Sequence, residues 1–264
     1  MSDALDGAQT AIAAGGSDTP RLDAELLLAH VLGVDRARLF IDDLYVEGAA
    51  VPAYRELVRR RSVEREPVAY LLGRRGFRRL DLEVDARVLI PRPETEHVVE
   101  VVVELAPPGA RVVDVGTGSG AIALALADER ADLAVVGSDV SASALEVASA
   151  NGSRLGLEVE WVLADGVPPG AWDVVVSNPP YVALDDPRLA PEVRAHEPHV
   201  ALFGGEDGLD VIRSLVGAGA PLLVLEVGEG QAQDVARLAK EAGYARVEAR
   251  GDLAGIDRVV IAWA

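Results

Sequence analysis

The hydrophobic positions in the first part of the chain recur every three or four residues, as they do along one face of an α-helix. The clearest case is residues 20–32, which begin with a proline and are followed by a glycine, as helices often are. Shorter stretches of the same kind cover residues 52–62 and 67–72. The pattern predicts a small helical domain over residues 1–73.

The spacing changes after that domain. Hydrophobic and charged residues alternate as far as residue 90, which is typical of a β-hairpin with one buried face. We interpret residues 74–90 as a hairpin that links the helical domain to a second domain over residues 91–264.

In the second domain, short apolar segments alternate with helical ones. Strands are expected at residues 111–115, 134–139, 159–163, 172–177, 221–227, 245–248 and 256–262, and helices at residues 119–129, 141–155, 208–216 and 231–241. Such alternation predicts an α/β fold, with helices on both faces of an open and mostly parallel sheet of seven strands. Only a loop separates the last two strands, so one of them should be antiparallel.

Composition and charge exclude several classes of protein. Half of the 264 residues are apolar, which is enough for a large core. The formal net charge of −18 repels a phosphate backbone at long range and argues against non-specific binding of DNA or RNA. Because there is no cysteine, the chain has no disulfide and no thiolate metal site, and we expect no bound metal.

Neither a membrane span nor a secretory signal is expected. No run of about 18 apolar residues is present. The first residues are acidic, and no apolar segment follows them. We therefore expect a cytoplasmic protein.

Basic residues concentrate in one stretch, which we call the arginine strip. It contains nine arginines against three glutamates: Arg55, Arg59, Arg60, Arg61, Arg65, Arg74, Arg75, Arg78 and Arg79. Two interpretations are open. The strip is either a solvated helix face that continues into a loop, as charge runs usually are, or a docking patch for an acidic partner.

A glycine-rich loop follows the first strand of the predicted sheet. Residues 114–120 read Asp-Val-Gly-Thr-Gly-Ser-Gly and open a helix. Glycines allow a tight turn and let a ligand approach the backbone without meeting a Cβ atom. The loop alone fits a nicotinamide or flavin nucleotide as well as S-adenosylmethionine, because Asp139 has the spacing of an acid that binds ribose hydroxyls.

Two features favour S-adenosylmethionine. Asp114 is suited to hold an ammonium group, directly or through water, whereas it would repel a pyrophosphate. The second feature is the turn that follows residues 172–177, which lies at the edge where ligands of such sheets bind. A dehydrogenase would need a proton donor for its substrate there, whereas this turn presents a carbonyl group fixed by prolines. Asp139 has one further interpretation, as a cap for the helix that begins near Ser141.

That turn consists of Asn178, Pro179, Pro180 and Tyr181, and we call it the acceptor turn. Its prolines fix φ and have no N–H, so the turn presents carbonyl oxygens with few competing donors. Asn178 adds a side-chain carbonyl and Tyr181 an aromatic face. A planar –NH2 group on a π system would find two acceptors and a ring there. The turn therefore predicts methylation of an amide or of an exocyclic amine.

Several segments together resemble the release factor glutamine methyltransferases. They are residues 89–96 (Leu-Ile-Pro-Arg-Pro-Glu-Thr-Glu), the glycine loop through residue 124, the acceptor turn, and residues 196–198, 201–202, 204–209 and 255–259. The match covers nearly the whole chain. It implies a class I S-adenosylmethionine-dependent methyltransferase, with a Rossmann-like sheet and an N-terminal helical domain that recognises the substrate.

The resemblance also implies a reaction and a site. The enzyme would methylate the side-chain amide nitrogen of the glutamine in the Gly-Gly-Gln motif of peptide chain release factors. S-adenosylmethionine would contact Gly116, Thr117, Gly118, Ser119, Gly120, Asp139, Asp165, Gly166 and Asn178. The glutamine would be held by Asn178, Pro179, Pro180 and Tyr181, and all of these except Pro180 would take part in catalysis.

One position departs from the family pattern. After Asp165 such enzymes often carry a bulky aromatic residue that lines the adenine pocket, and here the residue is Gly166. The adenine pocket must therefore have a different shape.

The residues leave other substrates open. A glutamine of a ribosomal protein would need the same chemistry. An adenine amino-methyltransferase would need a basic cleft and a target-recognition domain, and neither is evident in this acidic chain. A cofactor-binding module without activity would have no use for the acceptor turn. We expect a monomer that binds a protein substrate and neither nucleic acid nor a membrane.

Overall fold

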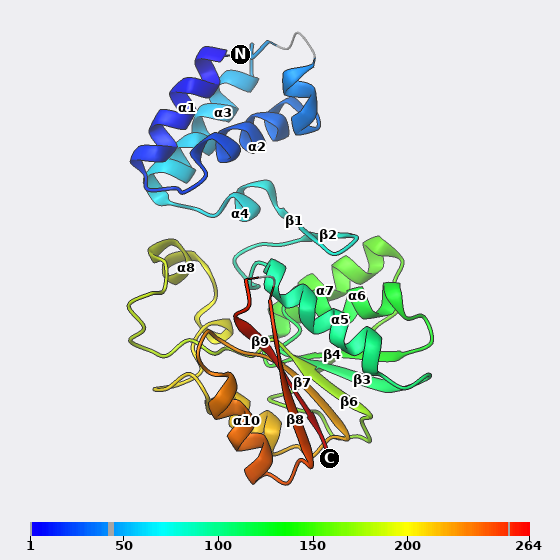
Figure 1. The fold of residues 1–264 in the computed structure, drawn as a ribbon. Helices are drawn as coiled ribbons and strands as arrows, with labels where there is room; N and C mark the ends of the chain where they lie inside the picture. Colours follow the sequence, from blue (N-terminus) through cyan, green and yellow to red (C-terminus); the bar gives the residue numbers. More distant parts are fainter. Residues whose placement is uncertain (1, 42–44, 253) are drawn as a thin grey trace. The chain divides into compact units, whose positions relative to one another are not determined.

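The chain folds as two units (Figure 1). The computed structural model describes residues 2–41, 45–252 and 254–264. The first unit contains Met1–Arg74 and Ala190–His196, and the second contains Arg75–Leu189 and Glu197–Ala264. We expected residues 91–264 to form one continuous domain, whereas Ala190–His196 groups with the N-terminal helices.

The first unit is helical, as the hydrophobic spacing predicts. Its elements are α1 (Ser2–Ala14), α2 (Pro20–Leu32), η1 (Arg36–Phe40), α3 (Ala50–Arg59), η2 (Arg60–Glu64), α4 (Val68–Leu72) and α8 (Pro191–His196). α2 has the predicted bounds, because Gly33 takes up φ 64° and donates its N–H to the carbonyl oxygens of Ala29 and His30. The buried side chains of Ile12, Leu27 and Leu28 form much of the core of this unit.

A buried ion cluster connects three elements of the first unit. Arg61 Nε donates to Asp23 Oδ2 at 2.8 Å, and its Nη1 donates to Glu192 Oε2 at 2.7 Å. Asp23 also accepts hydrogen bonds from Ser17 Oγ and Thr19 Oγ1, at 2.7 and 3.0 Å. Burial disfavours the charged guanidinium, but the hydrogen bonds from the two carboxylates outweigh burial and raise the pKa of Arg61. The cluster therefore holds α8 on the N-terminal helices through opposite charges.

Arg61→Ala should lower the free energy of unfolding by about 3 kcal/mol or more, because it leaves the carboxylate of Asp23 buried without its counter-charge. Arg59→Ala is the matched control, since Arg59 pairs with Glu56 and Glu64 at the surface, where ion pairs contribute little. Urea unfolding followed by circular dichroism measures both variants. Equal losses in the two variants would contradict the buried cluster as a source of stability.

Most arginines of the strip form ion pairs within the unit to which each belongs. The pairs are Arg59 with Glu56 and Glu64, Arg60 with Glu66, Arg61 with Asp23 and Glu192, Arg78 with Glu100 and Glu129, and Arg79 with Asp128. This pairing uses up much of the positive charge that a docking patch for an acidic partner would need. It favours the interpretation of the strip as ordinary charged surface.

The second unit contains a large sheet and, from Arg75 onward, a hairpin. The hairpin strands are β1 (Arg74–Phe77) and β2 (Leu80–Glu83), within the predicted residues 74–90. The large sheet has seven strands in the order β5-β4-β3-β6-β7-β9-β8. Their bounds are β3 (Arg111–Val115), β4 (Ala134–Asp139), β5 (Glu160–Leu163), β6 (Val174–Ser177), β7 (Leu222–Glu226), β8 (Arg246–Gly251) and β9 (Asp257–Trp263). β9 is antiparallel to both of its neighbours, which confirms the expected reversal near the end of the chain.

Helices cover both faces of this sheet (Figure 1). The helices of the second unit, among the described residues, are η3 (Pro93–Thr95), α5 (Glu96–Leu105), α6 (Ala121–Glu129), α7 (Ala142–Leu155), η4 (His199–Ala201), α9 (Asp210–Val216) and α10 (Ala232–Glu241). Successive residues of β6 show the result. Val174 and Val176 pack into the cluster with α5 and α6, while Val175 packs into the cluster with α9 and α10. β6 begins with three consecutive valines because both of its faces are buried, and only its last residue, Ser177, is polar.

The strand order places two loops side by side. β3 pairs with β6 in parallel, with Asp114 opposite Val176. On one side of this pair the chain continues to β4 and β5, and on the other side to β7. Ligands of such sheets bind where the order reverses, outside the carboxyl ends of the strands. The glycine loop after β3 and the acceptor turn after β6 both leave the sheet at that point.

Candidate functional site

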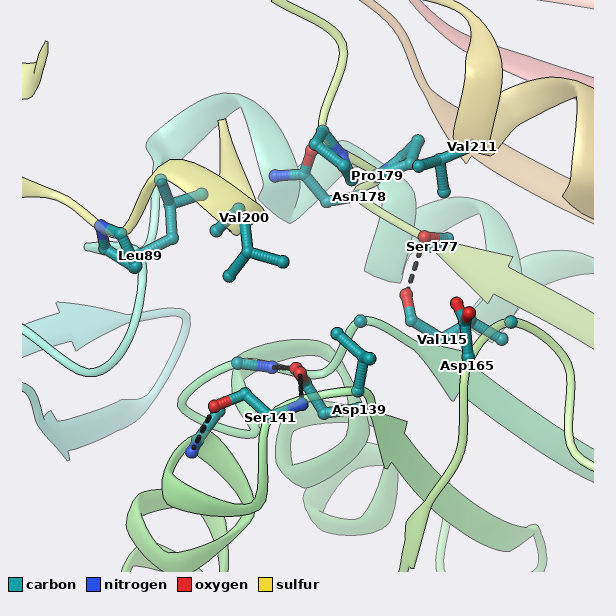
Figure 2. A pocket seen from close by; sticks show the side chains of 18 of the residues that line it. Leu89, Val115, Asp139, Ser141, Asp165, Ser177, Asn178, Pro179, Val200 and Val211 are labelled. Carbon is teal, nitrogen blue, oxygen red and sulfur yellow. Dashed lines mark hydrogen bonds between the residues drawn. The ribbon is translucent and has the colours of Figure 1, made fainter. Parts of the chain in front are cut away.

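A cavity of about 440 Å³ lies at the carboxyl ends of β3, β4 and β6 (Figure 2). Asn178 and Pro179 lie on one side of it, and Asp139 and Ser141 lie across from them. A cavity of this size is typical of a site for a small molecule or cofactor. Ser177 Oγ donates to the carbonyl oxygen of Val115 at 2.6 Å and thereby ties the two loops together at its floor.

Two glycines of the loop line the cavity. Gly116 and Gly118 have φ of 73° and 56°, in the left-handed region that favours glycine. A Cβ atom at either position would meet no protein atom within 4 Å, and both residues border the cavity. The N–H groups of Gly116 and Thr117 donate to the carbonyl oxygen of Ser138, at 2.8 and 2.9 Å. The loop is thus a fixed cradle with room for a ligand above it.

The other predicted loop residues support the cradle from below. Thr117 and Ser119 are buried, and Gly120 precedes the first turn of α6. The side chain of Asn151 donates to the carbonyl oxygen of Ser119 at 3.0 Å. None of these three loop residues borders the cavity, so their contact with a cofactor stays a prediction.

Asp114 fastens the loop and does not border the cavity. Its Oδ2 accepts hydrogen bonds from Thr117 Oγ1 at 2.6 Å and from the N–H of Ala123 at 3.2 Å. Burial raises the pKa of this carboxyl to about 7. The expectation that Asp114 holds an ammonium group is therefore not supported, because the side chain is fully buried and points into the loop and α6.

Asp139 is placed to bind hydroxyl groups. Its Oδ2 accepts the N–H of Gly118, and its Oδ1 accepts the N–H of Ser141, both at 2.9 Å. The capping residue of α7 is Ser141, whose Oγ accepts from the N–H of Ala144, so Asp139 is not the cap. Each carboxylate oxygen can accept a further hydrogen bond, and Asp139 borders the cavity.

Much of the cavity lining is apolar, including Val140, Val211 and Leu215. Asp165 and Gly166 also border the cavity. A Cβ atom at Gly166 would meet only Ser214 Oγ, at 3.7 Å, so this position contributes space and no side chain. The departure from the family pattern at Gly166 thus widens the pocket next to Asp165.

One part of the acceptor turn borders the cavity, and the other part contacts the protein interior. Asn178, Pro179 and Pro180 border the cavity, whereas Tyr181 does not. Asn178 Nδ2 donates to Thr95 Oγ1 at 3.0 Å, which fixes the plane of the side-chain amide. Tyr181 Oη donates to Glu226 Oε1 at 3.1 Å. The packing of the Tyr181 ring against a substrate amide stays a prediction.

Sequence reasoning missed Thr95 and Glu226 as partners of the turn. Thr95 lies within residues 89–96, which carried the family resemblance, but nothing there indicates its target. Glu226 offered a clearer signal, because it is an acidic residue at the end of an otherwise apolar strand and is 1% exposed. An ionisable side chain in such a position usually has a partner or a function.

The site fits S-adenosylmethionine. The open space over Gly116 and Gly118 admits a ligand close to the backbone, Asp139 suits ribose hydroxyls, and the apolar part of the lining suits a base. Among the described residues, no group of histidine, cysteine, aspartate and glutamate side chains could hold a metal ion. Over the same residues, no helix is long and apolar enough to cross a membrane.

Comparisons with known proteins agree with this assignment. Residues 3–73 match the family model described as the PrmC N-terminal domain, and residues 95–192 match the model described as the methyltransferase small domain. The chain resembles a methyltransferase from Pyrococcus furiosus, with a TM-score of 0.53 and 18% identity, over 70% of this chain and 88% of that one. It also resembles the catalytic domain of hMettl16 in complex with the MAT2A 3′UTR hairpin 6, with a TM-score of 0.56 and 15% identity, over 81% of each chain. At these identities the two structures show the fold alone.

Fold and site together define a class I S-adenosylmethionine-dependent methyltransferase. Two sequence relatives are release factor glutamine methyltransferases. That of Mycolicibacterium smegmatis is 43% identical over 275 residues, which cover 98% of this chain and 96% of the relative. That of Xylella fastidiosa (strain Temecula1) is 43% identical over 266 residues, 95% of each chain. The chain belongs to the release factor glutamine methyltransferase family.

Proposed function

We propose that this enzyme methylates the side-chain amide nitrogen of the glutamine in the Gly-Gly-Gln motif of peptide chain release factors. The observation that carries the proposal is the position of Asn178, which borders the cofactor cavity while its Nδ2 is bonded to Thr95. Because the donor end of the side chain is already used, its Oδ1 is the end that can accept a hydrogen from a substrate amide.

The acceptor turn has to overcome the poor nucleophilicity of an amide nitrogen, whose lone pair is delocalised into the carbonyl group. In our proposal, Asn178 Oδ1 and the carbonyl oxygen of Pro179 each accept one amide hydrogen and so orient the nitrogen. Both prolines favour this arrangement, since they fix the backbone and add no competing N–H.

S-adenosylmethionine supplies an electrophilic methyl group bound to a sulfonium sulfur. As the nitrogen lone pair forms the new N–C bond, the bond between the methyl carbon and sulfur breaks and its electron pair stays on sulfur. The nitrogen becomes pyramidal and partly positive, and the two oxygen acceptors bind its hydrogens more strongly than before. This is stabilisation of the transition state over the ground state. Alignment of the reacting groups can contribute roughly 7 kcal/mol or more. The extra proton on nitrogen then passes to water, so the turn needs no strong general base.

The N-terminal helical unit is the proposed site of substrate selection. Residues 3–73 match a family model of their own, separate from the one that matches the catalytic domain. The polar contacts of the catalytic cavity described above come from the second unit alone and account for the cofactor and one amide group. Recognition of a particular protein therefore requires a further surface.

A methyl-transfer assay with labelled cofactor tests the proposed function. The enzyme is offered a release factor, the same release factor with the motif changed to Gly-Gly-Ala, a mixture of ribosomal proteins, and DNA or RNA. We expect label only in the unaltered release factor, at the glutamine. Label in a ribosomal protein, in nucleic acid or in the altered release factor would overturn the assignment of the substrate.

Tyr181→Ala should raise KM for the release factor by about tenfold or more, because it removes the ring that would pack on the glutamine amide. KM for S-adenosylmethionine should change little, since Tyr181 does not border the cavity. Tyr181→Phe is the matched control that keeps the ring and removes only the hydroxyl bonded to Glu226. An unchanged KM for the release factor in Tyr181→Ala would exclude the stacking role.

A further inference from the structure

We propose that Thr95 and Glu226 are positioning residues that hold both ends of the acceptor turn in register for methyl transfer. The inference rests on the proposed function and adds to it two residues that do not border the cavity themselves. Thr95 ends η3, and Glu226 ends β7, so two separate elements meet behind the turn.

The first end of the turn is Asn178. Its Nδ2 donates to Thr95 Oγ1 at 3.0 Å, so the threonine oxygen acts as an acceptor in this contact. The single hydroxyl hydrogen of Thr95 must therefore point elsewhere. Thr95 is 4% exposed, and its hydroxyl favours the ionised form of Glu226.

The other end of the turn is Tyr181. Its Oη donates to Glu226 Oε1 at 3.1 Å, and its carbonyl oxygen accepts from Gln231 Nε2 at 3.0 Å. Gln231 Oε1 in turn accepts the N–H of Gly228, just after β7. Side chain and backbone of Tyr181 are thus both fixed to the end of β7 and the segment that follows it.

The acceptor of the Tyr181 hydroxyl is a buried carboxylate. Glu226 is 1% exposed, and its Oε2 has no hydrogen-bond partner among the described residues. Leaving a carboxylate oxygen buried in this way costs stability. A glutamate at this position therefore lowers the stability of the fold. Its proposed role is to order the acceptor turn.

The direction of the hydrogen bonds explains how the two residues act on the turn. Thr95 Oγ1 accepts from Asn178 Nδ2, and this polarity keeps Asn178 Oδ1 as the acceptor for the substrate. An ionised Glu226 only accepts hydrogen bonds, so it accepts the hydroxyl hydrogen of Tyr181. A protonated Glu226 can donate a hydrogen bond instead, which removes the preference for this arrangement.

Several charged groups act on Glu226 and set its protonation. Burial raises its pKa to about 7, the hydroxyls of Thr95 and Tyr181 oppose this rise, Glu94 adds to it, and Arg258 counters it. Since the folded-state pKa is raised, the contribution of this group to stability is full below about pH 4 and is lost as the pH rises through 7. Methyl transfer should show the opposite trend, because the ionised form orients the turn.

The test compares Thr95→Val, Thr95→Ser, Glu226→Gln and the control Tyr244→Phe, which also removes a buried polar atom of the second unit. With the release factor as substrate, we expect kcat to fall about 100-fold in Thr95→Val, because Asn178 Oδ1 is no longer held in place as the acceptor. In Thr95→Ser, which keeps the hydroxyl, kcat should recover. KM for S-adenosylmethionine should stay within about twofold of the wild type, since neither residue borders the cavity. Tyr244→Phe should keep wild-type kcat.

The pH profile separates positioning from a structural role. In the wild type, kcat should rise with an inflection near pH 7, and in Glu226→Gln this inflection should be absent. Circular dichroism checks that each variant folds, and Thr95→Ser keeps the test valid should Thr95→Val fail to fold. Wild-type kcat in Thr95→Val, or an unchanged pH profile in Glu226→Gln, would overturn the inference. A wild type that does not methylate the release factor would instead overturn the proposed function.

Discussion

Asn178→Ala is expected to lower kcat for methyl transfer about 1,000-fold, the loss typical of removing one preorganised hydrogen-bonding group at a reacting centre. The substitution removes Oδ1, the proposed acceptor for an amide hydrogen, together with the bond from Nδ2 to Thr95. Affinity for S-adenosylmethionine should remain close to that of the wild type, because Asp139 and the glycine cradle are untouched. Isothermal titration calorimetry measures the affinity, and single-turnover transfer of labelled methyl measures the rate.

Asn178→Asp provides the matched control for size. The carboxylate keeps an oxygen at the position of Oδ1 but cannot donate to Thr95, so it should also be slow. Turnover at the wild-type rate in Asn178→Ala would remove the acceptor role from the mechanism. A large loss of cofactor affinity in that variant would show that Asn178 serves binding and not catalysis.

Asp139→Ala should weaken S-adenosylmethionine binding about 100-fold, because about 3 kcal/mol is lost with the charged acceptor for the ribose hydroxyls. The same change leaves the N–H groups of Gly118 and Ser141 without their partner, so the cradle itself should loosen. The dissociation constant measured by calorimetry tests this result directly.

Asp132→Ala is a suitable comparison for Asp139, since Asp132 pairs with Arg130 on the surface and does not border the cavity. Its cofactor affinity should equal that of the wild type. A dissociation constant for Asp139→Ala within about twofold of the wild type would show that Asp139 has only a structural role in the loop.

Much of the fold could be predicted because buried strands and amphipathic helices have distinct periods. Strands β3 and β4 and helix α2 have the bounds that the pattern indicates. Helix α5 was missed, although five of its residues are valines and four of these are buried, because β-branched residues also favour strands. Helix α8 was missed as well, since it has no buried residue and leaves no hydrophobic pattern.

The cavity could be anticipated from local sequence, whereas its supporting contacts could not. A glycine loop and a proline-fixed turn are local features, and the strand order then brings them together. The bond between Asn178 and Thr95 joins residues 83 positions apart, and that between Tyr181 and Glu226 joins residues 45 positions apart. Asp114 was misjudged for a related reason. Its charge was visible in the sequence, but its complete burial under the loop was not.

The discontinuous make-up of the first unit has a consequence for engineering chimeric enzymes. Because Ala190–His196 folds with Met1–Arg74, a relative's N-terminal segment grafted alone would meet a foreign α8. The grafted segment would then carry a partner for Glu192, the counter-ion of Arg61, only by chance. To exchange substrate preference between homologues, the segment 1–74 and the segment 190–196 would have to be transferred together, because they fold as one unit.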